Sequence, residues 1–231
     1  MRILFIRHGE PDYEHDCLTE TGKKQAQATA LRLDGENISE IYASPMGRAQ
    51  QTAQCTAQRL GLPITTLDYM HEISWGGQGI PVEGHPWTLS DWMIAREGYD
   101  FYKNDWREHP YFKENAAMDH YDHVTAEFDL FLEKQGFHHE GSRFFCTEDN
   151  DKTIAVFSHG GSGACVPSHL LTLPFPYVCT VMPYYFTSVI ILEFCGSKGD
   201  YVYPRLELFN DVSHLQKDSV QLVIQQNVDA G

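Results

Sequence analysis

The sequence predicts an α/β fold with a mainly parallel sheet sandwiched by helices, and three observations lead to it. First, short apolar runs alternate with segments of helical spacing, which is typical of strand–helix–strand units. Second, residues 3–6 are apolar without interruption, as expected of a parallel strand that is covered on both faces. Third, three groups of reactive side chains each follow an expected strand directly.

The first half of the chain supplies strands and helices in alternation. A helix is expected from Thr19, a good capping residue, to about Gly35, and a second helix ends at Gly61, which suits the position after a C-cap. The strand before the second helix stops at Ser44-Pro45. The expected strands are residues 3–6, 38–43 and 62–67, and the expected helices are residues 19–35 and 48–60.

The second half has a different character. Residues 83–150 hold many Trp, His, Tyr and acidic residues with little alternation, so we expect a mainly helical insertion over the active site, packed on one edge of the sheet. Strands are expected at 153–157, 189–194 and 202–209, the last two as a hairpin-type pair. The last 15 or so residues are a polar tail or a terminal helix. Residues 1–231 are interpreted as one domain with this insert.

Composition excludes several classes of function. Lys and Arg number 17 against 32 Asp and Glu, and the net charge of −15 disfavours nucleic acid as a partner. No apolar run approaches the roughly 20 residues that cross a bilayer, so no membrane partner is expected. The six Cys lack CxxC spacing, which favours free thiols in a reducing compartment. We therefore expect a cytoplasmic protein.

The three reactive groups are residues 7–10, 44–48 and 158–161. Ligands of open α/β sheets bind at the carboxyl ends of strands, so these groups can converge. Arg7 and Arg48 suit phosphoryl oxygens, and His8 and His159 suit nucleophilic and electrostatic roles. Backbone N–H groups of Gly160 and Gly161 could bind an anion at a helix N-terminus. The sequence contains no GxxxxGK[ST] phosphate loop.

The motifs RHGE, SPxxRAxQT and SHGG, in this order, make the sequence resemble the histidine phosphatase superfamily, which includes the cofactor-dependent phosphoglycerate mutases. The resemblance covers about residues 1–75 and 153–215. It rests on these positions: 7–10, 18–19, 22, 25–26, 44–45, 48–49, 51–52, 72, 158–161, 210–211 and 213–215.

The resemblance implies a phosphoglycerate mutase-like fold and a phosphohistidine mechanism. His8 would be the nucleophile, while Arg7, Arg48 and His159, with Gly160, would hold the phosphoryl oxygens. Glu72 would protonate the leaving alcohol and then activate water. Phosphoryl transfer needs positioning and positive charge, which arginine and histidine supply, so neither a metal nor another cofactor is expected.

Several assignments stay open at this point. Glu10 and Glu83 compete with Glu72 for the acid role. Tyr13, Glu14 and Trp75 are candidates for the rim of the site. His120 and His123 have the spacing of metal ligands on one helix face, although a solvated polar face is the simpler interpretation.

The resulting hypothesis is a metal-independent phosphatase that hydrolyses a small phosphorylated metabolite. The alternatives are a phosphoglycerate mutase, a non-catalytic binding module on the same fold and a metal-dependent hydrolase. Pro11-Asp12-Tyr13 after Glu10 departs from the mutase pattern. The insert at 83–150 would form the specificity wall. The substrate and the assembly state, including a homodimer, are left open.

Overall fold

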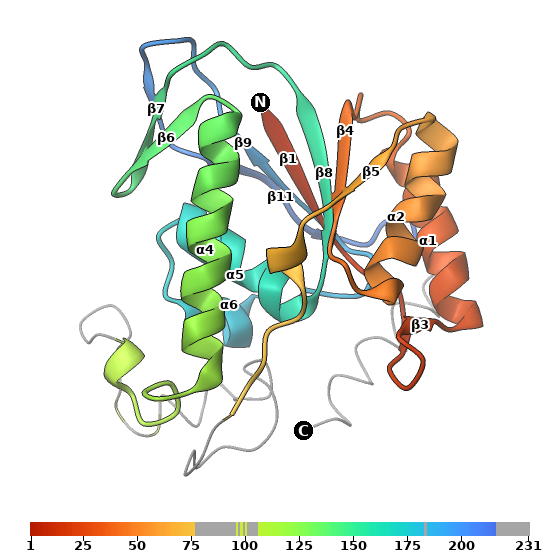
Figure 1. Ribbon diagram of the computed structural model, residues 1–231, viewed down its shortest axis with the longest axis horizontal. Helices are drawn as coiled ribbons and strands as arrows, with labels where there is room; N and C mark the ends of the chain where they lie inside the picture. The colour runs from red at the N-terminus through yellow and green to blue at the C-terminus, as the bar shows by residue number, and fades with distance from the viewer. Residues whose placement is uncertain (77–95, 97, 99, 101–105, 183, 216–231) are drawn as a thin grey trace.

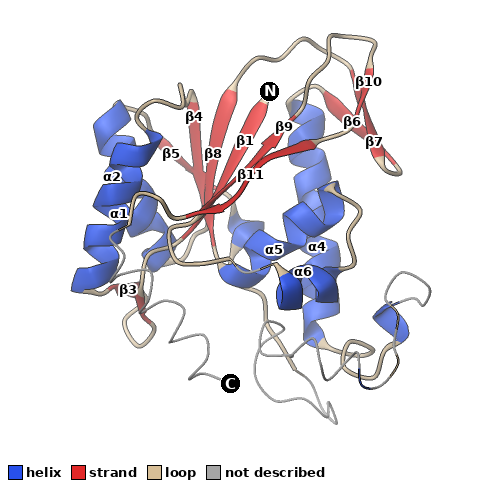
Figure 2. Ribbon diagram, turned by 180° about the vertical axis from the view of Figure 1, so that it is seen from behind, coloured by secondary structure: helices blue, strands red, loops and turns tan. Residues whose placement is uncertain are grey.

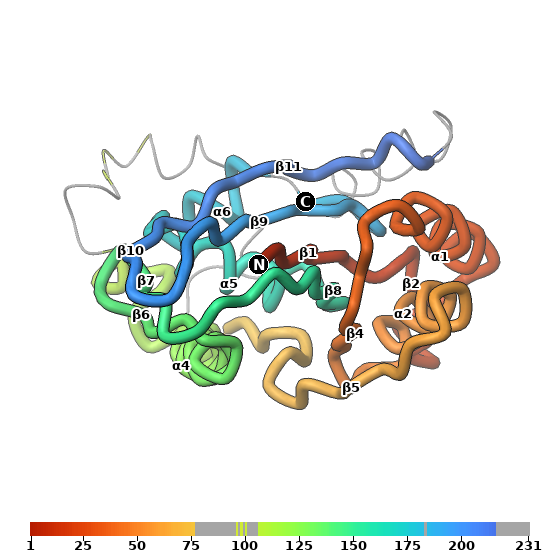
Figure 3. Tube along the Cα trace, turned by 90° about the horizontal axis from the view of Figure 1, so that it is seen from above, coloured from red at the N-terminus to blue at the C-terminus, as the bar shows by residue number. Residues whose placement is uncertain are grey.

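The computed structural model describes residues 1–76, 96, 98, 100, 106–182 and 184–215. Its central sheet has six strands in the order β11-β9-β1-β8-β4-β5 (Figure 3). Strands β1, β8, β4 and β5 are parallel, and β9 and β11 are antiparallel to their neighbours. The bounds are β1 Arg2–Arg7, β4 Glu40–Ala43, β5 Ile64–Thr66, β8 Thr153–Ser158, β9 Val189–Glu193 and β11 Arg205–Asp211. The mainly parallel sheet and the antiparallel β9–β11 pair are confirmed.

Helices cover both faces of this sheet (Figures 1 and 2). Helices α1 (Glu20–Leu33) and α2 (Gly47–Leu60) lie on one face, and α4 (Ala116–Lys134), α5 (Gly160–Leu170) and α6 (Phe175–Val181) lie on the other. Alternate residues of β1 therefore enter two cores: Ile3 and Phe5 pack towards α4 and α5, whereas Leu4 and Ile6 pack towards α1 and α2. This two-sided burial explains the uninterrupted apolar run.

The helix ends follow the expected capping chemistry. The Thr19 side chain accepts a hydrogen bond from the Gly22 amide and so begins α1. Helix α2 ends at Gly61, whose φ of 68° is left-handed and favours glycine. Helix α1 ends at Leu33, two residues before the predicted Gly35. The short elements β2 (Pro11–Asp12), β3 (Cys17–Leu18) and η1 (Asp68–Met70) complete the first half.

The prediction of a mainly helical insert is wrong for residues 137–146. The 3-10 helix η3 (Trp106–Glu108) and α4 are followed by a β-hairpin of β6 (Phe137–Glu140) and β7 (Arg143–Cys146), which pairs with β10 (Tyr201–Val202) in a second sheet. Each hairpin strand has only four residues and β6 carries two histidines, so the alternation was too short to recognise.

The position of the insert also differs from the prediction. Helix α4 lies across a face of the sheet rather than on its edge, with the Phe128 ring 5.7 Å from that of Phe5. Residues 83–95, 97, 99 and 101–105 of the predicted insert, and the predicted tail at 216–231, lie outside the described residues. The six cysteines are free thiols, as predicted. Among the described helices, none combines the length and the apolar character needed to cross a bilayer.

Candidate active site

The register of the sheet brings the three reactive groups to one edge. Arg7 at the end of β1 pairs with Ser158 of β8, and Phe157 of β8 pairs with Ala43 of β4. The next residues stay aligned, because the His8 amide donates to the Ser158 carbonyl at 2.9 Å. The predicted convergence is therefore confirmed. We call the five side chains of Arg7, His8, Arg48, Glu72 and His159 the strand-end site.

The imidazole of His8 is buried and held at both nitrogens. Its Nδ1 lies 2.7 Å from the Gly9 carbonyl oxygen, which accepts only from a protonated nitrogen, so Nε2 keeps its lone pair. Arg48 Nε donates to that Nε2 at 3.3 Å. Burial, and then the charges of Arg7 and Arg48, lower the pKa of His8 well below its usual value. His8 is therefore neutral, with an unprotonated Nε2 facing a guanidinium group.

Arg48 lies at the first turn of α2 and is fixed by a residue that the motifs do not reveal. Its Nη1 pairs with Asp16 Oδ1 at 2.6 Å, and the Gly47 amide donates to Asp16 Oδ2 at 2.6 Å. Asp16 thus caps α2 and orients Arg48 at once. The Tyr13 ring lies 5.5 Å from the Arg48 guanidinium carbon, so Tyr13 does reach the rim of the site, as predicted.

Arg7 is buried under the segment before β9. Its Nη1 donates to the Tyr184 carbonyl, and its guanidinium carbon lies 4.3 Å from the centre of the Phe186 ring. Among the described residues, Arg7 Nε has no hydrogen-bond partner. Burial lowers the pKa of Arg7, but arginine remains cationic in proteins. Arg7 therefore offers a free N–H donor in a buried setting.

His159 precedes α5, and its ring centre lies 5.1 Å from that of His8. Its Nε2 is 2.7 Å from Ser44 Oγ, and among the described residues its Nδ1 has no partner. Burial, and then the neighbouring His8 and arginines, lower the pKa of His159 well below its usual value. In the empty site the low pKa of His159 disfavours its charged form, and the two arginines supply the positive charge.

Glu72 is held by the N-terminus of α5. Its Oε1 accepts hydrogen bonds from the amides of Gly161 (3.0 Å), Ser162 (3.1 Å) and Ile73 (3.0 Å). The expectation that Gly161 donates to a bound anion is thus corrected, since its N–H binds an internal carboxylate. A Cβ at Gly161 would lie 2.4 Å from Ile73 Cγ1, which explains the glycine.

Gly160 packs its backbone on the arginine of the first motif. A Cβ at Gly160 would lie 3.4 Å from Arg7 Cζ, which is van der Waals distance. The structure therefore places Gly160 at the strand-end site.

The competing residues lie elsewhere or have structural contacts. Glu10 Oε1 accepts from Thr19 Oγ1 at 2.7 Å and so supports the start of α1. Glu83 lies outside the described residues. The Trp75 ring packs edge-on against Phe112, 5.6 Å between centres, as in a hydrophobic core.

The pair His120 and His123 lacks the surroundings of a metal centre. His120 Nδ1 accepts from the Ser74 amide at 2.8 Å. Within the described part of the chain, neither histidine belongs to a group of three metal-binding side chains. The strand-end site itself presents guanidinium and imidazole groups, which suit an oxyanion rather than a metal ion.

Comparison with known proteins identifies the family. The family model of the histidine phosphatase superfamily (branch 1) matches residues 3–206. The chain therefore belongs to that superfamily, and the predicted fold and resemblance are confirmed. The chain is 35% identical over 83 residues to a 2,3-bisphosphoglycerate-dependent phosphoglycerate mutase of Thermoplasma acidophilum. The aligned segment covers 32% of this chain and 42% of that protein. The chain spans about two-fifths of the length of the curated relatives it matches.

Solved structures share the fold at low identity. A phosphoserine phosphatase from Entamoeba histolytica, in complex with 3-phosphoglyceric acid, has a TM-score of 0.63 and 24% identity, covering 93% of this chain and 99% of that one. A mycobacterial glucosyl-3-phosphoglycerate phosphatase has a TM-score of 0.61 and 22% identity, covering 90% and 98%. At these identities the likeness concerns the fold.

Proposed function

We propose that the protein is a metal-independent phosphatase that hydrolyses small phosphomonoesters through a phosphohistidine at His8. The observation that carries the proposal is the state of His8. Its Nδ1 is committed to the Gly9 carbonyl, so Nε2 is the unprotonated nitrogen that acts as nucleophile, and the Arg48 Nε–H that it accepts turns to a phosphoryl oxygen when the ester binds. The lowered pKa keeps this nitrogen unprotonated across the neutral range.

In the first step, His8 Nε2 attacks the phosphorus in line as the bond to the leaving oxygen breaks. Arg7 and Arg48 bind the phosphoryl oxygens, whose charge spreads in the transition state. Ser44 and α5 orient the ring of His159, which donates a further hydrogen bond when the phosphoryl dianion favours its protonation.

Glu72 supplies the proton for the leaving group. Three backbone amides fix the position of its Oε1. A proton on the Glu72 carboxyl group is part of the proposed reactive state. Glu72 then gives its proton to the leaving alkoxide. In the second step it takes a proton from the water that attacks phosphorus, and the bond to His8 breaks.

Two observations favour a phosphatase over a mutase. The residues that depart from the mutase pattern after Glu10 form a small hairpin, in which residues 11–12 (β2) pair with 17–18 (β3). The loop of this hairpin carries Asp16, which binds Arg48. Two solved structures of the same fold are named as phosphatases of small phosphorylated compounds, phosphoserine and glucosyl-3-phosphoglycerate. We therefore propose a small phosphorylated metabolite as the substrate class.

The test measures products from phosphoserine, 3-phosphoglycerate and sugar phosphates in the presence of EDTA. The proposal expects free phosphate from at least one of them, inhibition by vanadate and little 2-phosphoglycerate, with or without a bisphosphate primer. Rapid primed isomerisation of 3-phosphoglycerate would identify a mutase instead. A complete lack of turnover, with binding retained, would favour a non-catalytic module.

A further inference from the structure

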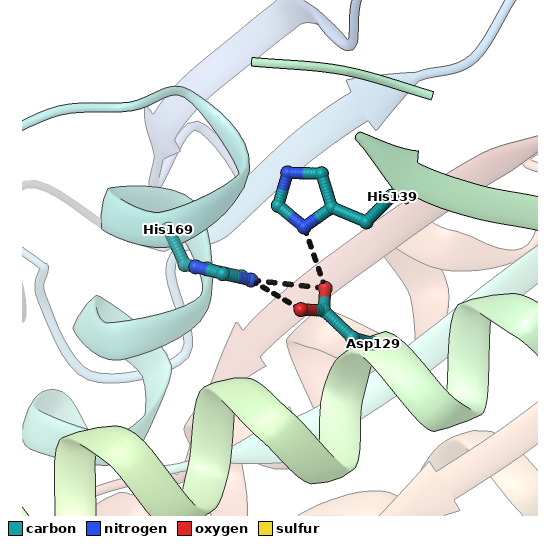
Figure 4. A group of neighbouring side chains, drawn as sticks. All are labelled: Asp129, His139 and His169. Atoms are coloured by element: carbon teal, nitrogen blue, oxygen red, sulfur yellow. Dashed lines mark hydrogen bonds and ion pairs between the residues drawn. The ribbon is translucent and has the colours of Figure 1, made fainter. Parts of the chain in front are cut away.

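A second group of polar side chains lies far from the strand-end site. Asp129 of α4, His139 of β6 and His169 in the last turn of α5 point toward one another (Figure 4). His139 Nδ1 is 2.9 Å from Asp129 Oδ1, and His169 Nε2 is 2.9 Å from both carboxylate oxygens. We call these three residues the hairpin cluster. Their potential ligand atoms all lie within 4.8 Å of one another.

The cluster is held in place by its surroundings. The His139 ring stacks on Phe144 of the facing strand, with centres 4.2 Å apart and planes 10° from parallel. The His169 ring lies edge-on to the His139 ring, with centres 4.7 Å apart. Burial raises the pKa of Asp129, but the hydrogen bonds from both histidines outweigh it and lower that pKa to about 2. The carboxylate is therefore ionised at neutral pH, and two imidazoles lie against it.

The cluster also opens to a cavity of about 580 Å³. His139 and His169 line this cavity together with Trp106, Arg107, Tyr121 and Asp122. The Asp122 carboxylate in this lining is paired with Arg107. A cavity of this size admits water and small solutes to the ligand atoms.

We propose that the hairpin cluster binds a divalent transition-metal ion of the zinc class, through the Asp129 carboxylate, His139 Nδ1 and His169 Nε2. Two imidazoles and one carboxylate are borderline ligands that suit such ions better than magnesium or calcium. Water from the cavity completes the coordination. In the ion-free arrangement, protons on the ring nitrogens bridge the same atoms.

The geometry needs a small opening of the cluster. Tetrahedral zinc with bonds of 2.0–2.2 Å holds its ligand atoms about 3.3–3.6 Å apart. The nitrogen–oxygen separations are 2.9 Å and must lengthen by about 0.4–0.7 Å, while the two nitrogens already lie within 4.8 Å of each other. Each coordinating nitrogen releases its proton to solvent or to the other ring nitrogen.

The ion would join three elements that are distant in sequence: α4, the β6–β7 hairpin and the end of α5. Helix α5 begins beside the strand-end site and ends at the cluster, about 15 Å further along the helix at 1.5 Å per residue. The inference thus concerns a separate site, which does not depend on the proposed phosphatase activity.

The experiment titrates untagged, EDTA-treated protein with Zn²⁺ by calorimetry and follows its melting temperature. We expect one equivalent bound with a Kd of about 1 μM or tighter, and a rise in Tm of roughly 5–10 °C at 100 times the Kd. Asp129→Asn, His139→Gln and His169→Gln should each weaken binding at least 100-fold, more than the roughly 10–100-fold typical of residues that only orient a ligand.

His138→Gln is the matched control. His138 is on the same strand, is exposed and bonds to Glu133, so its loss should leave zinc affinity unchanged. Circular dichroism checks that each variant folds. If a variant misfolds, the absorption spectrum of the wild-type protein loaded with Co²⁺ serves as the test instead, and it should show the ligand-field bands of four-coordinate cobalt. Absent or millimolar binding, binding unchanged in the three variants, or a spectrum of fully hydrated cobalt would overturn the proposal and leave a hydrogen-bonded triad.

Discussion

In the strand-end site, His8 and His159 are fully buried beside two guanidinium groups, whereas in the hairpin cluster His139 and His169 lie partly buried beside one carboxylate. Positive neighbours and burial disfavour the imidazolium form of the first pair. In the second pair, the carboxylate accepts hydrogen bonds from both rings. Histidine thus contributes to a candidate anion-binding site in one place and to a candidate cation-binding site in the other, according to its neighbours.

Apart from the loss of His8 itself, the largest effect should come from the carboxylate at the strand-end site. Glu72→Gln keeps the size of the side chain but removes the proton donor, so alkyl phosphates should lose about 10²–10⁴-fold in kcat/KM. The nitrophenol burst from p-nitrophenyl phosphate should fall much less, because that leaving group needs little protonation. Stopped-flow measurement of both substrates checks this.

Glu10→Gln is the control for that substitution, since Glu10 bonds to Thr19 at the start of α1. Glu10→Gln should leave the ratio of the rates on the alkyl phosphate and on p-nitrophenyl phosphate as it is in the wild-type protein. Equal loss on both substrates in Glu72→Gln would remove the acid role from Glu72.

A smaller effect is expected from the residue that orients Arg48. Asp16→Asn keeps an oxygen for the Gly47 amide but removes the charge that holds the Arg48 guanidinium. Vanadate affinity and kcat/KM should both fall roughly tenfold, which corresponds to about 1.4 kcal/mol. Asp12→Asn, at the end of β2 in the same hairpin and bonded to His15, should retain both values. An Asp16→Asn variant with normal vanadate affinity would show that Arg48 needs no such support.

Acid should separate the histidines of the strand-end site from exposed ones. The folded-state pKa of His8 is well below the unfolded value near 6.5, so the unfolded chain binds more protons as the pH falls below about 6.5. Stability is therefore lost progressively as the pH falls below about 6.5. Urea unfolding at several pH values should show that the free energy of unfolding falls less steeply with acid in His8→Gln than in the wild-type protein.

His138→Gln provides the opposite case. The hydrogen bond with Glu133 raises the pKa of His138, so this histidine adds stability at low pH. Its removal therefore cannot make the free energy of unfolding less dependent on pH. An unchanged slope in His8→Gln would mean that His8 is not held neutral in the folded protein.

The sequence was informative wherever backbone topology fixes the position of a side chain. The meeting of Arg7, His8, Arg48 and His159 could be predicted because each ends or follows a strand, or begins a helix, at the same edge of the sheet. Asp16 was missed, since its role depends on a loop that folds back on α2 and leaves no motif.

The hairpin cluster was missed for a different reason. Its three residues lie 10 and 30 positions apart, and they meet only because α4, β6 and the end of α5 pack together. No local spacing encodes such a meeting. The metal-like spacing of His120 and His123, by contrast, was visible in sequence, yet His120 accepts a backbone hydrogen bond instead.

The central claim is that His8 carries the phosphoryl group during turnover. The direct measurement mixes enzyme with labelled phosphomonoester, quenches within milliseconds without acid, and maps the label by mass spectrometry. We expect a phosphohistidine at His8 that forms and decays at rates compatible with turnover, together with a loss of at least about 10³-fold in kcat for His8→Gln. Label on another residue, or substantial turnover by His8→Gln, would contradict it.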